Sequence, residues 1–175
     1  MKVTMSTLDL KAIFEACKGF VSKSDLRPAM QGIQLNFSNK QCTAYAMDNI
    51  KLMQIVVPYT DGDEGTMLVP MIKLPRNPFV TLSDEGNELV FDFHSCKQTV
   101  RKYAGDFLQE PDRCFPTADP NLTIYFDPKS LKDALDGFKT CTAIELQFHG
   151  QTGGCTIYGK NRKALILPVR PPKNI

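Results

Sequence analysis

The stretch DLKAIFEACKGFVSKSDLRPAMQGIQLNF, residues 9–37, changes its apolar period part-way along, and this change is the strongest signal of fold class in the chain. In its first half, apolar residues recur at steps of three and four: Leu10, Ile13, Phe14, Cys17 and Val21. This spacing gathers them on one stripe of a helix, and Ser6, with Asp9 three positions further on, supplies a helix start. The pattern predicts a helix over residues 7–20 with Phe14 buried.

On either side of this helix, apolar residues alternate with polar ones, which is typical of strands. A short strand is predicted over residues 3–5, and three more over 30–37, 41–47 and 50–58. The connections SNK and Asp48-Asn49 suit tight turns. The first third is therefore expected to form a strand, a helix and a three-stranded meander.

The last third repeats that order. LTIYF, residues 122–126, is predicted to be a strand, and Asp127 and Pro128 suit the N-cap and first position of a helix. The expected buried stripe of this helix consists of Leu131, Ala134, Leu135 and Phe138. Strands are predicted at about 143–149, 155–158 and 164–169. A shift of 121 positions lays Ser6 on Asp127, so an internal duplication is the simplest explanation.

The middle of the chain has strand patterns without a helix pattern. The runs at 66–70, 79–83, 89–94 and 98–103 are β-like. Pro75 and Pro78 stand where a helix would be needed, which predicts a copy of the unit that has lost its helix. We expect a first lobe over 1–112, a connector at 113–120 and a second unit over 121–175.

A family resemblance rests on seven residues of the first third: Ser22, Lys23, Arg27, Pro28, Gly32, Asp48 and Leu52. They fit the S-K-x-x-x-R-P-x-L-x-G-I connection and the A-T-D-x-x-R-L strand pair of the bacterial DNA polymerase III beta subunit, the sliding clamp, which the chain resembles. ALILPVRP, residues 164–171, is similar to that family's closing strand. The chain departs from the family in having Asn49-Ile50 for Gly-His and Met47 for Thr, and it has about half the length of an ordinary clamp subunit.

The resemblance implies an α+β, DNA clamp-like fold of repeated βαβββ units, with antiparallel sheets and two main helices. It also implies that basic residues on and near the helices contact the DNA backbone. The candidates are Lys11, Lys18, Lys23, Arg27, Lys129, Lys132 and Lys139. Asp9 and Glu15 share the first helix, and Asp133 and Asp136 the second, so ordinary solvated helix faces stay an open alternative.

A second implied site is an apolar pocket that captures a short peptide from polymerases. The candidates are Leu52, Leu165, Leu167, Pro168 and Arg170. The alternative, equally open, is that the leucines are ordinary strand residues facing a sheet core.

The remaining chemistry of the sequence is sparse. Six cysteines lie without a C-x-x-C pair, so we expect reduced packing residues and no metal site. His94 and His149 have no second ligand at useful spacing, and Gly153-Gly154 is predicted to be a hairpin turn, without the pattern of a phosphate loop. No catalytic residue and no cofactor are expected.

The charge and the start of the chain bear on partners and location. A net charge of +2 is too small to predict nucleic-acid binding by itself, so a DNA-facing surface would have to be local. The start lacks the pattern of a signal peptide, and no apolar run approaches the roughly 20 residues that span a bilayer. We expect a cytoplasmic protein.

Two functions stay open at this point. The first is a non-catalytic processivity or docking factor, which binds double-stranded DNA without sequence preference and docks DNA polymerase or other proteins with clamp-binding motifs. We expect it to be a homo-oligomer, with a dimer favoured, because clamp-like units leave open sheet edges. The second is a decoy or regulator from a phage or mobile element, which binds replication proteins without encircling DNA. An enzyme would need a nucleophile, an acid–base pair or a metal cluster, and none stands out.

Overall fold

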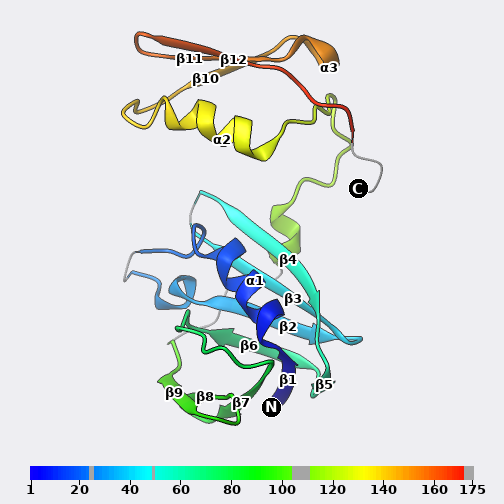
Figure 1. Ribbon diagram of the computed structural model, residues 1–175, viewed down its shortest axis with the longest axis vertical. Helices are drawn as coiled ribbons and strands as arrows, with labels where there is room; N and C mark the ends of the chain where they lie inside the picture. Colours follow the sequence, from blue (N-terminus) through cyan, green and yellow to red (C-terminus); the bar gives the residue numbers. More distant parts are fainter. Residues whose placement is uncertain (24–25, 49, 104–110, 172–175) are drawn as a thin grey trace. The chain divides into compact units, whose positions relative to one another are not determined.

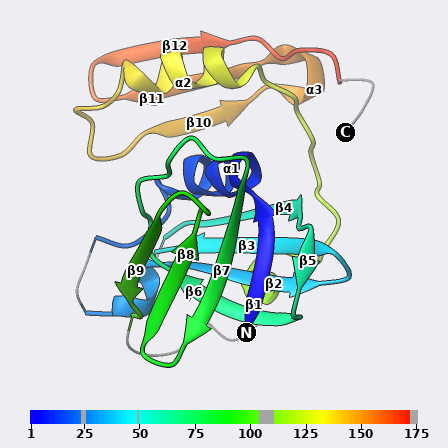
Figure 2. The same ribbon diagram turned by 60° about the horizontal axis from the view of Figure 1, so that its bottom comes forward.

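The computed structural model describes residues 1–23, 26–48, 50–103 and 111–171. The chain divides into two units, Met1–Pro116 and Thr117–Ile175. Figures 1 and 2 show the elements of each unit. Every strand pairing is antiparallel, and the described residues contain few helices, which confirms the predicted α+β class.

Unit 1 contains two sheets. The first has the order β5-β1-β7-β8-β9: Asp61–Gly62, Lys2–Ser6, Phe79–Glu85, Glu88–Asp92 and Lys97–Arg101. The second has the order β4-β3-β2-β6: Leu52–Pro58, Gln41–Met47, Ile33–Ser38 and Gly65–Val69. Strand β1 pairs with β7 over its whole length, so the first and middle parts of the sequence share one sheet. Figure 2 shows the two sheets as separate layers.

Helix α1, Thr7–Cys17, packs against strands of both sheets. The Ser6 hydroxyl oxygen accepts a hydrogen bond from the Leu8 amide at 3.2 Å, so Ser6 is the N-cap. Leu10, Ile13 and Phe14 are buried, as predicted, in a core that both sheets share. The helix ends at Cys17, three residues before the predicted end, and the following 3-10 turn η1, Pro28–Gln31, leads into β2.

The connection between β6 and β7, residues 70–78, forms no helix, as the two prolines predict. Side chains hold it in place instead. The Asn77 amide donates to the Phe93 carbonyl at 2.9 Å, and the Gln98 amide donates to the Lys73 carbonyl at 3.0 Å. The Thr7 amide donates to the Pro78 carbonyl at 3.0 Å, which ties the end of this connection to the start of α1.

Unit 2 contains one helix and one sheet. Helix α2, Pro128–Asp136, lies with the strands β10, β11 and β12: Glu145–Phe148, Cys155–Gly159 and Arg162–Ile166. The predicted cap is confirmed, because the Asp127 carboxylate accepts from the Ser130 amide at 2.7 Å. Phe138, just after α2, is buried with Cys155, Ile157 and Ile166.

The last strand, predicted over 164–169, begins two residues earlier and ends at Ile166. Three further expectations for unit 2 are wrong. Leu135 is 37% exposed, because Leu131, Ala134 and Phe138 already cover the apolar face of a sheet of only three strands. The link from β10 to β11 is no tight turn, since it includes the one-turn helix α3, Gly150–Gly153.

The segment LTIYF, residues 122–126, is the third of these, because it forms no strand. Its one described backbone hydrogen bond across the unit joins the Tyr125 carbonyl to the Val169 amide at 2.8 Å. A longer ladder would have to run along residues 167–171, where Pro168 and Pro171 have no N–H group to donate. No helix in the described part of the chain is long and apolar enough to cross a membrane.

Candidate functional site

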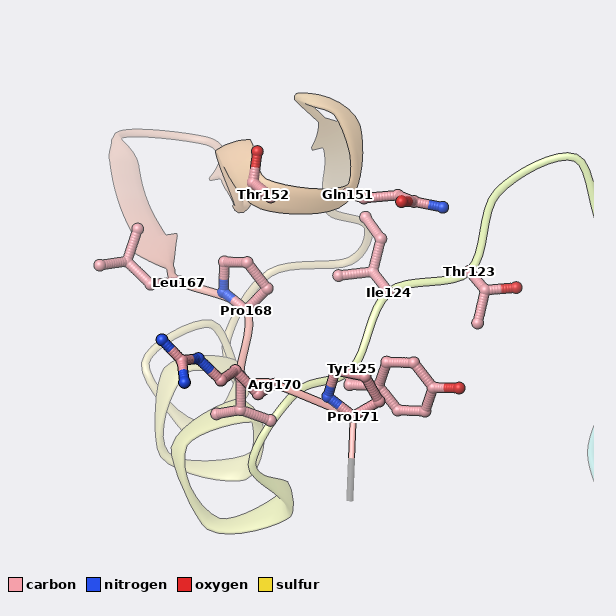
Figure 3. A pocket seen from close by; sticks show the side chains of 10 residues that line it. Thr123, Ile124, Tyr125, Gln151, Thr152, Leu167, Pro168, Arg170 and Pro171 are labelled. Carbon is pink, nitrogen blue, oxygen red and sulfur yellow. The ribbon is translucent and has the colours of Figure 1, made fainter. Parts of the chain in front are cut away.

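Unit 2 has a pocket of about 630 Å³ beside the chain that follows β12, and we call it the β12 pocket. Figure 3 shows that its side chains come from three segments: the chain before α2, the α3 turn and the chain after β12. The lining residues are Thr123, Ile124, Tyr125, Gln151, Thr152, Leu167, Pro168, Val169, Arg170 and Pro171.

Two backbone features hold these segments together. The hydrogen bond from the Val169 amide to the Tyr125 carbonyl fixes the first segment beside the third. Gly154, which follows α3, has φ +84°, and a Cβ built on it would lie 2.6 Å from the Ile166 carbonyl oxygen. Only glycine lets the α3 turn approach the end of β12 so closely, so Gly154 positions Gln151 and Thr152 at the pocket.

The pocket combines apolar surface with a few polar groups. Ile124, Leu167 and Val169 offer aliphatic contacts, together with the rings of two prolines. Gln151 and Arg170 can donate hydrogen bonds to peptide carbonyls or carboxylates. An apolar surface with a few hydrogen-bonding groups suits a short peptide that inserts one or two apolar anchors.

Three of the five predicted pocket residues, Leu167, Pro168 and Arg170, line the β12 pocket. Leu167 is 66% exposed and Leu165 is 61% exposed, so neither is a core residue, which rules out that alternative for both. Leu165 lies on β12 but is outside the pocket lining. Leu52 lies in unit 1, where it is half-buried against Met30, Tyr45 and Met47. Its participation in one site with Leu167 stays a prediction.

Sequence reasoning missed the other two segments of the pocket. Ile124 and Tyr125 were expected to be part of a strand, and Gln151 and Thr152 lay in an expected turn. Neither segment has a motif. The signals that could have found them are the glycine at 154 and the prolines at 168 and 171, which force irregular backbone at both edges.

The basic residues predicted to contact DNA fall into two groups. In the first, Lys11 lies 3.7 Å from Glu15, and Lys132 and Lys139 lie 2.6 and 3.3 Å from Asp136. The hydrogen bond from Lys132 to Asp136 raises the pKa of that lysine and lowers the pKa of the aspartate. The second group is exposed and forms no ion pair with any described residue: Lys18, Lys23, Arg27 and Lys129. Both groups are compatible with an ordinary solvated surface as well as with DNA contact.

The histidines and cysteines form no reactive arrangement within the described ranges. His149 is hydrogen-bonded to the Thr156 hydroxyl at 2.9 Å. Among the residues that the structure describes, no three His, Cys, Asp or Glu side chains gather where they could hold a metal ion. Cys17, Cys42 and Cys155 are buried, as expected of packing residues. Cys96 and Cys114 are exposed, so that expectation is wrong for these two.

Several solved bacterial clamps are similar to this chain. The DNA polymerase III beta chain from Streptococcus pneumoniae TIGR4 is 18% identical with a TM-score of 0.84, over 97% of this chain and 50% of that one. The C. crescentus beta sliding clamp is 18% identical with a TM-score of 0.78, over 95% and 50%. The Helicobacter pylori beta clamp bound to a DNA ligase peptide is 16% identical with a TM-score of 0.65, over 95% and 52%.

No protein-family model and no curated protein matches the chain. The chain spans about half the length of the solved clamps. At identities below 20%, the likeness concerns the course of the backbone rather than particular side chains. The antiparallel sheets and these neighbours together show that the chain has the fold of the bacterial DNA polymerase III beta subunit, the sliding clamp, over about half of that subunit's length.

Proposed function

We propose that this protein is a non-catalytic docking module of DNA replication, which binds short linear peptides of polymerases or other replication proteins in the β12 pocket. The observation that carries the proposal is the exposure of Leu167 within a pocket that also offers Gln151 and Arg170. Removing an apolar side chain from water is favourable, so a peptide with apolar anchors would gain binding free energy by covering Leu167. The DNA ligase peptide bound to the Helicobacter pylori clamp is a precedent for this kind of ligand on this fold.

Contact with double-stranded DNA is the second part of the proposal. The cations that form no ion pair within the described ranges would provide a sequence-independent contact to phosphates: Lys18, Lys23, Arg27 and Lys129. The ion pairs of Lys11 and Lys132 are exposed and therefore weak, so a phosphate can compete for either lysine. In this proposal the protein acts in the cytoplasm. It forms a homo-oligomer, because edge strands such as β10 and β12 leave backbone N–H and C=O groups with which a second copy can pair.

The charge pattern favours a second candidate function. Glu15 and Asp136 lie beside three of the seven predicted DNA-binding residues, which lowers the positive potential of both helices. A decoy that binds replication proteins without encircling DNA would need no such potential. The two functions share the peptide site and differ in whether a DNA duplex binds.

Photocrosslinking tests the peptide site. The probe is a short peptide with a glutamine followed by apolar and aromatic anchors, in which a benzophenone amino acid replaces the aromatic anchor. We expect crosslinks to residues 123–125 or 167–171, lost in the presence of excess unmodified peptide. A peptide of the same composition in scrambled order is the control. Crosslinks scattered over both units, or insensitive to competitor, would overturn the proposed site.

A further inference from the structure

Unit 1 contains a second hollow, of about 670 Å³, which runs between α1 and the connection at residues 70–78. We call it the α1 groove. It is lined by Thr7, Leu8, Lys11, Phe14, Glu15, Lys18, Met71, Ile72, Leu74, Pro75, Arg76, Asn77 and Pro78. All of these residues belong to unit 1.

The groove lies where the second strand–helix–meander unit lacks its helix. In the first unit α1 joins β1 to β2, whereas in the second unit the non-helical residues 70–78 join β6 to β7. One stripe of α1 lines this hollow, because Leu8, Lys11 and Glu15 on the helix and Lys18 at its C-cap follow one another at steps of three, four and three. The stripe therefore has no helix of the second unit beside it.

The lining of the groove combines exposed apolar side chains with three cations, Lys11, Lys18 and Arg76, and one anion, Glu15. Leu8 is 75% exposed and Met71 is 38% exposed, with Phe14 buried beneath them. Lys11 is paired with Glu15, but Lys18 and Arg76 form no ion pair with the residues that the structure describes. Exposed apolar side chains beside two uncompensated cations complement a ligand that is both apolar and acidic.

A buried hydroxyl, that of Thr7, lies in the groove lining at the N-terminus of α1. Thr7 is 5% exposed, and its Oγ1 has no hydrogen-bond partner among the described residues. Buried hydroxyls are almost always hydrogen-bonded, so this one marks a place where the polar contacts are incomplete.

We propose that the α1 groove binds an amphipathic helix from a partner protein, with an apolar stripe that packs on Leu8 and Met71 and acidic residues that pair with Lys18 and Arg76. The helix would take the place that the second unit leaves without one, in the manner of helix-in-groove recognition. Charge complementarity selects an acidic helix, and an apolar stripe on that helix would cover the exposed apolar side chains, which a DNA backbone cannot do. Lys18 also belongs to the proposed DNA contact, so the helix and a duplex would compete for this lysine. This site is separate from the β12 pocket and does not depend on the function proposed for it.

The test uses a fluorescein-labelled peptide of about 14 residues, roughly four helical turns, with leucines at i, i+3, i+4 and i+7, glutamates beside them and alanine elsewhere. Fluorescence anisotropy measures its affinity for the full chain. We expect saturable binding with a dissociation constant of roughly 10 µM. A peptide of the same composition, with its leucines spread around the helix, should bind at least about tenfold more weakly, because it lacks an apolar face.

Four variants locate the contact. Leu8→Asp, and the double variant Lys18→Glu with Arg76→Glu, should each weaken binding at least about tenfold. Ile50→Asp is the matched control, because Ile50 is an exposed apolar residue outside the groove, and it should bind as the parent does. Leu167→Ala in the β12 pocket should also leave this affinity unchanged. A peptide with lysine in place of glutamate should bind the double variant more tightly than it binds the parent. This result would show that the double variant is folded and that its weaker binding of the acidic peptide comes from the changed charges.

Three results would overturn the proposal. One is the absence of saturable binding, and another is equal binding of both leucine arrangements. The third is a labelled DNA duplex that binds through Lys18 and Arg76 while the acidic peptide does not bind, since the groove would then face nucleic acid.

Discussion

The Tyr45 hydroxyl donates a hydrogen bond to the Asp112 carboxylate, with the two oxygens 2.8 Å apart, and so joins strand β3 to the last segment of unit 1. The Gln54 amide reaches the same carboxylate at 2.9 Å. Asp112 belongs to the 3-10 turn η2, Pro111–Cys114. Two side chains of the β4-β3-β2-β6 sheet therefore hold the end of unit 1 against that sheet.

Tyr45→Phe should lower the free energy of unfolding by about 1–2 kcal/mol, because it removes the hydrogen bond that the hydroxyl donates to Asp112 and the one that it accepts from the Gln54 amide at 3.2 Å. Of the hydrogen bonds that Asp112 accepts from these two side chains, only the one from Gln54 then remains. Burial and the bond to Asp112 raise the pKa of Tyr45. The folded state thus holds the Tyr45 proton more tightly than the unfolded state does. The stability that this proton contributes is complete below the unfolded pKa of about 10, and it is lost as the pH rises through the folded pKa. Urea unfolding from pH 8 upward should show a smaller alkaline loss in Tyr45→Phe. Tyr158→Phe is the control. An identical alkaline loss of stability in the parent, Tyr45→Phe and Tyr158→Phe would contradict the conclusion that Tyr45 has a raised pKa in the folded state.

Thr7→Val should stabilise the protein by about 1 kcal/mol, because a methyl group replaces a buried hydroxyl that has no hydrogen-bond partner among the described residues. Thr4→Val is the matched control, since the Thr4 hydroxyl lies 3.0 Å from that of Thr81 and forms a hydrogen bond with it. The two variants should shift the urea midpoint in opposite directions. A loss of stability in both would mean that the Thr7 hydroxyl has a partner after all.

The cysteines should differ sharply in reactivity. Burial raises the pKa of Cys17 to about 11, and burial and the neighbouring Cys17 raise the pKa of Cys42 to about 12, so both stay protonated and unreactive at pH 8. Cys96 and Cys114 are exposed and should react first with Ellman's reagent. A double variant, Cys96→Ser with Cys114→Ser, should lose this fast phase. Fast reaction of Cys17 or Cys42 in the folded protein would contradict this prediction, because it would show that the reagent can enter the core of unit 1.

Capping residues and prolines determined the parts of the fold that could be predicted. Ser6 and Asp127 act locally on the amides of their own helices, so the sequence alone identifies both helix starts. The prolines within residues 70–78 likewise act locally.

Features that depend on contacts far apart in the sequence could not be predicted. Leu135 fits a helical stripe, but its exposure depends on the number of strands under α2. Tyr125 and Gln151 reach the β12 pocket only because distant segments meet there, and no local pattern marks that meeting. The prolines predict that residues 70–78 form no helix, but the α1 groove also depends on how this connection packs beside α1, which no local pattern shows.

DNA contact should depend on the helix lysines and on salt. Replacing Lys11, Lys18 and Lys132 together by Glu should abolish duplex binding, because each change replaces a cation with an anion on a helix. Electrophoretic mobility shifts at several salt concentrations measure this, and binding of the parent should fall steeply with salt regardless of sequence. Unchanged binding in the triple variant would show that the helices are not the DNA face. Absence of duplex binding by the parent would favour the decoy function.

Peptide affinity and thermal unfolding, measured on the same Leu167→Ala protein, test the docking function most directly. A short peptide with a glutamine followed by apolar and aromatic anchors should bind the parent with micromolar affinity, about −8 kcal/mol. Leu167→Ala should remove about 1–2 kcal/mol of that binding energy, because central apolar anchors dominate such sites. It should leave the unfolding temperature nearly unchanged, since Leu167 is 66% exposed. Leu146→Ala, at an exposed leucine outside the pocket, is the control and should bind as the parent does. No saturable binding by the parent, or equal affinity of the parent and Leu167→Ala, would contradict the proposal that the β12 pocket is the docking site.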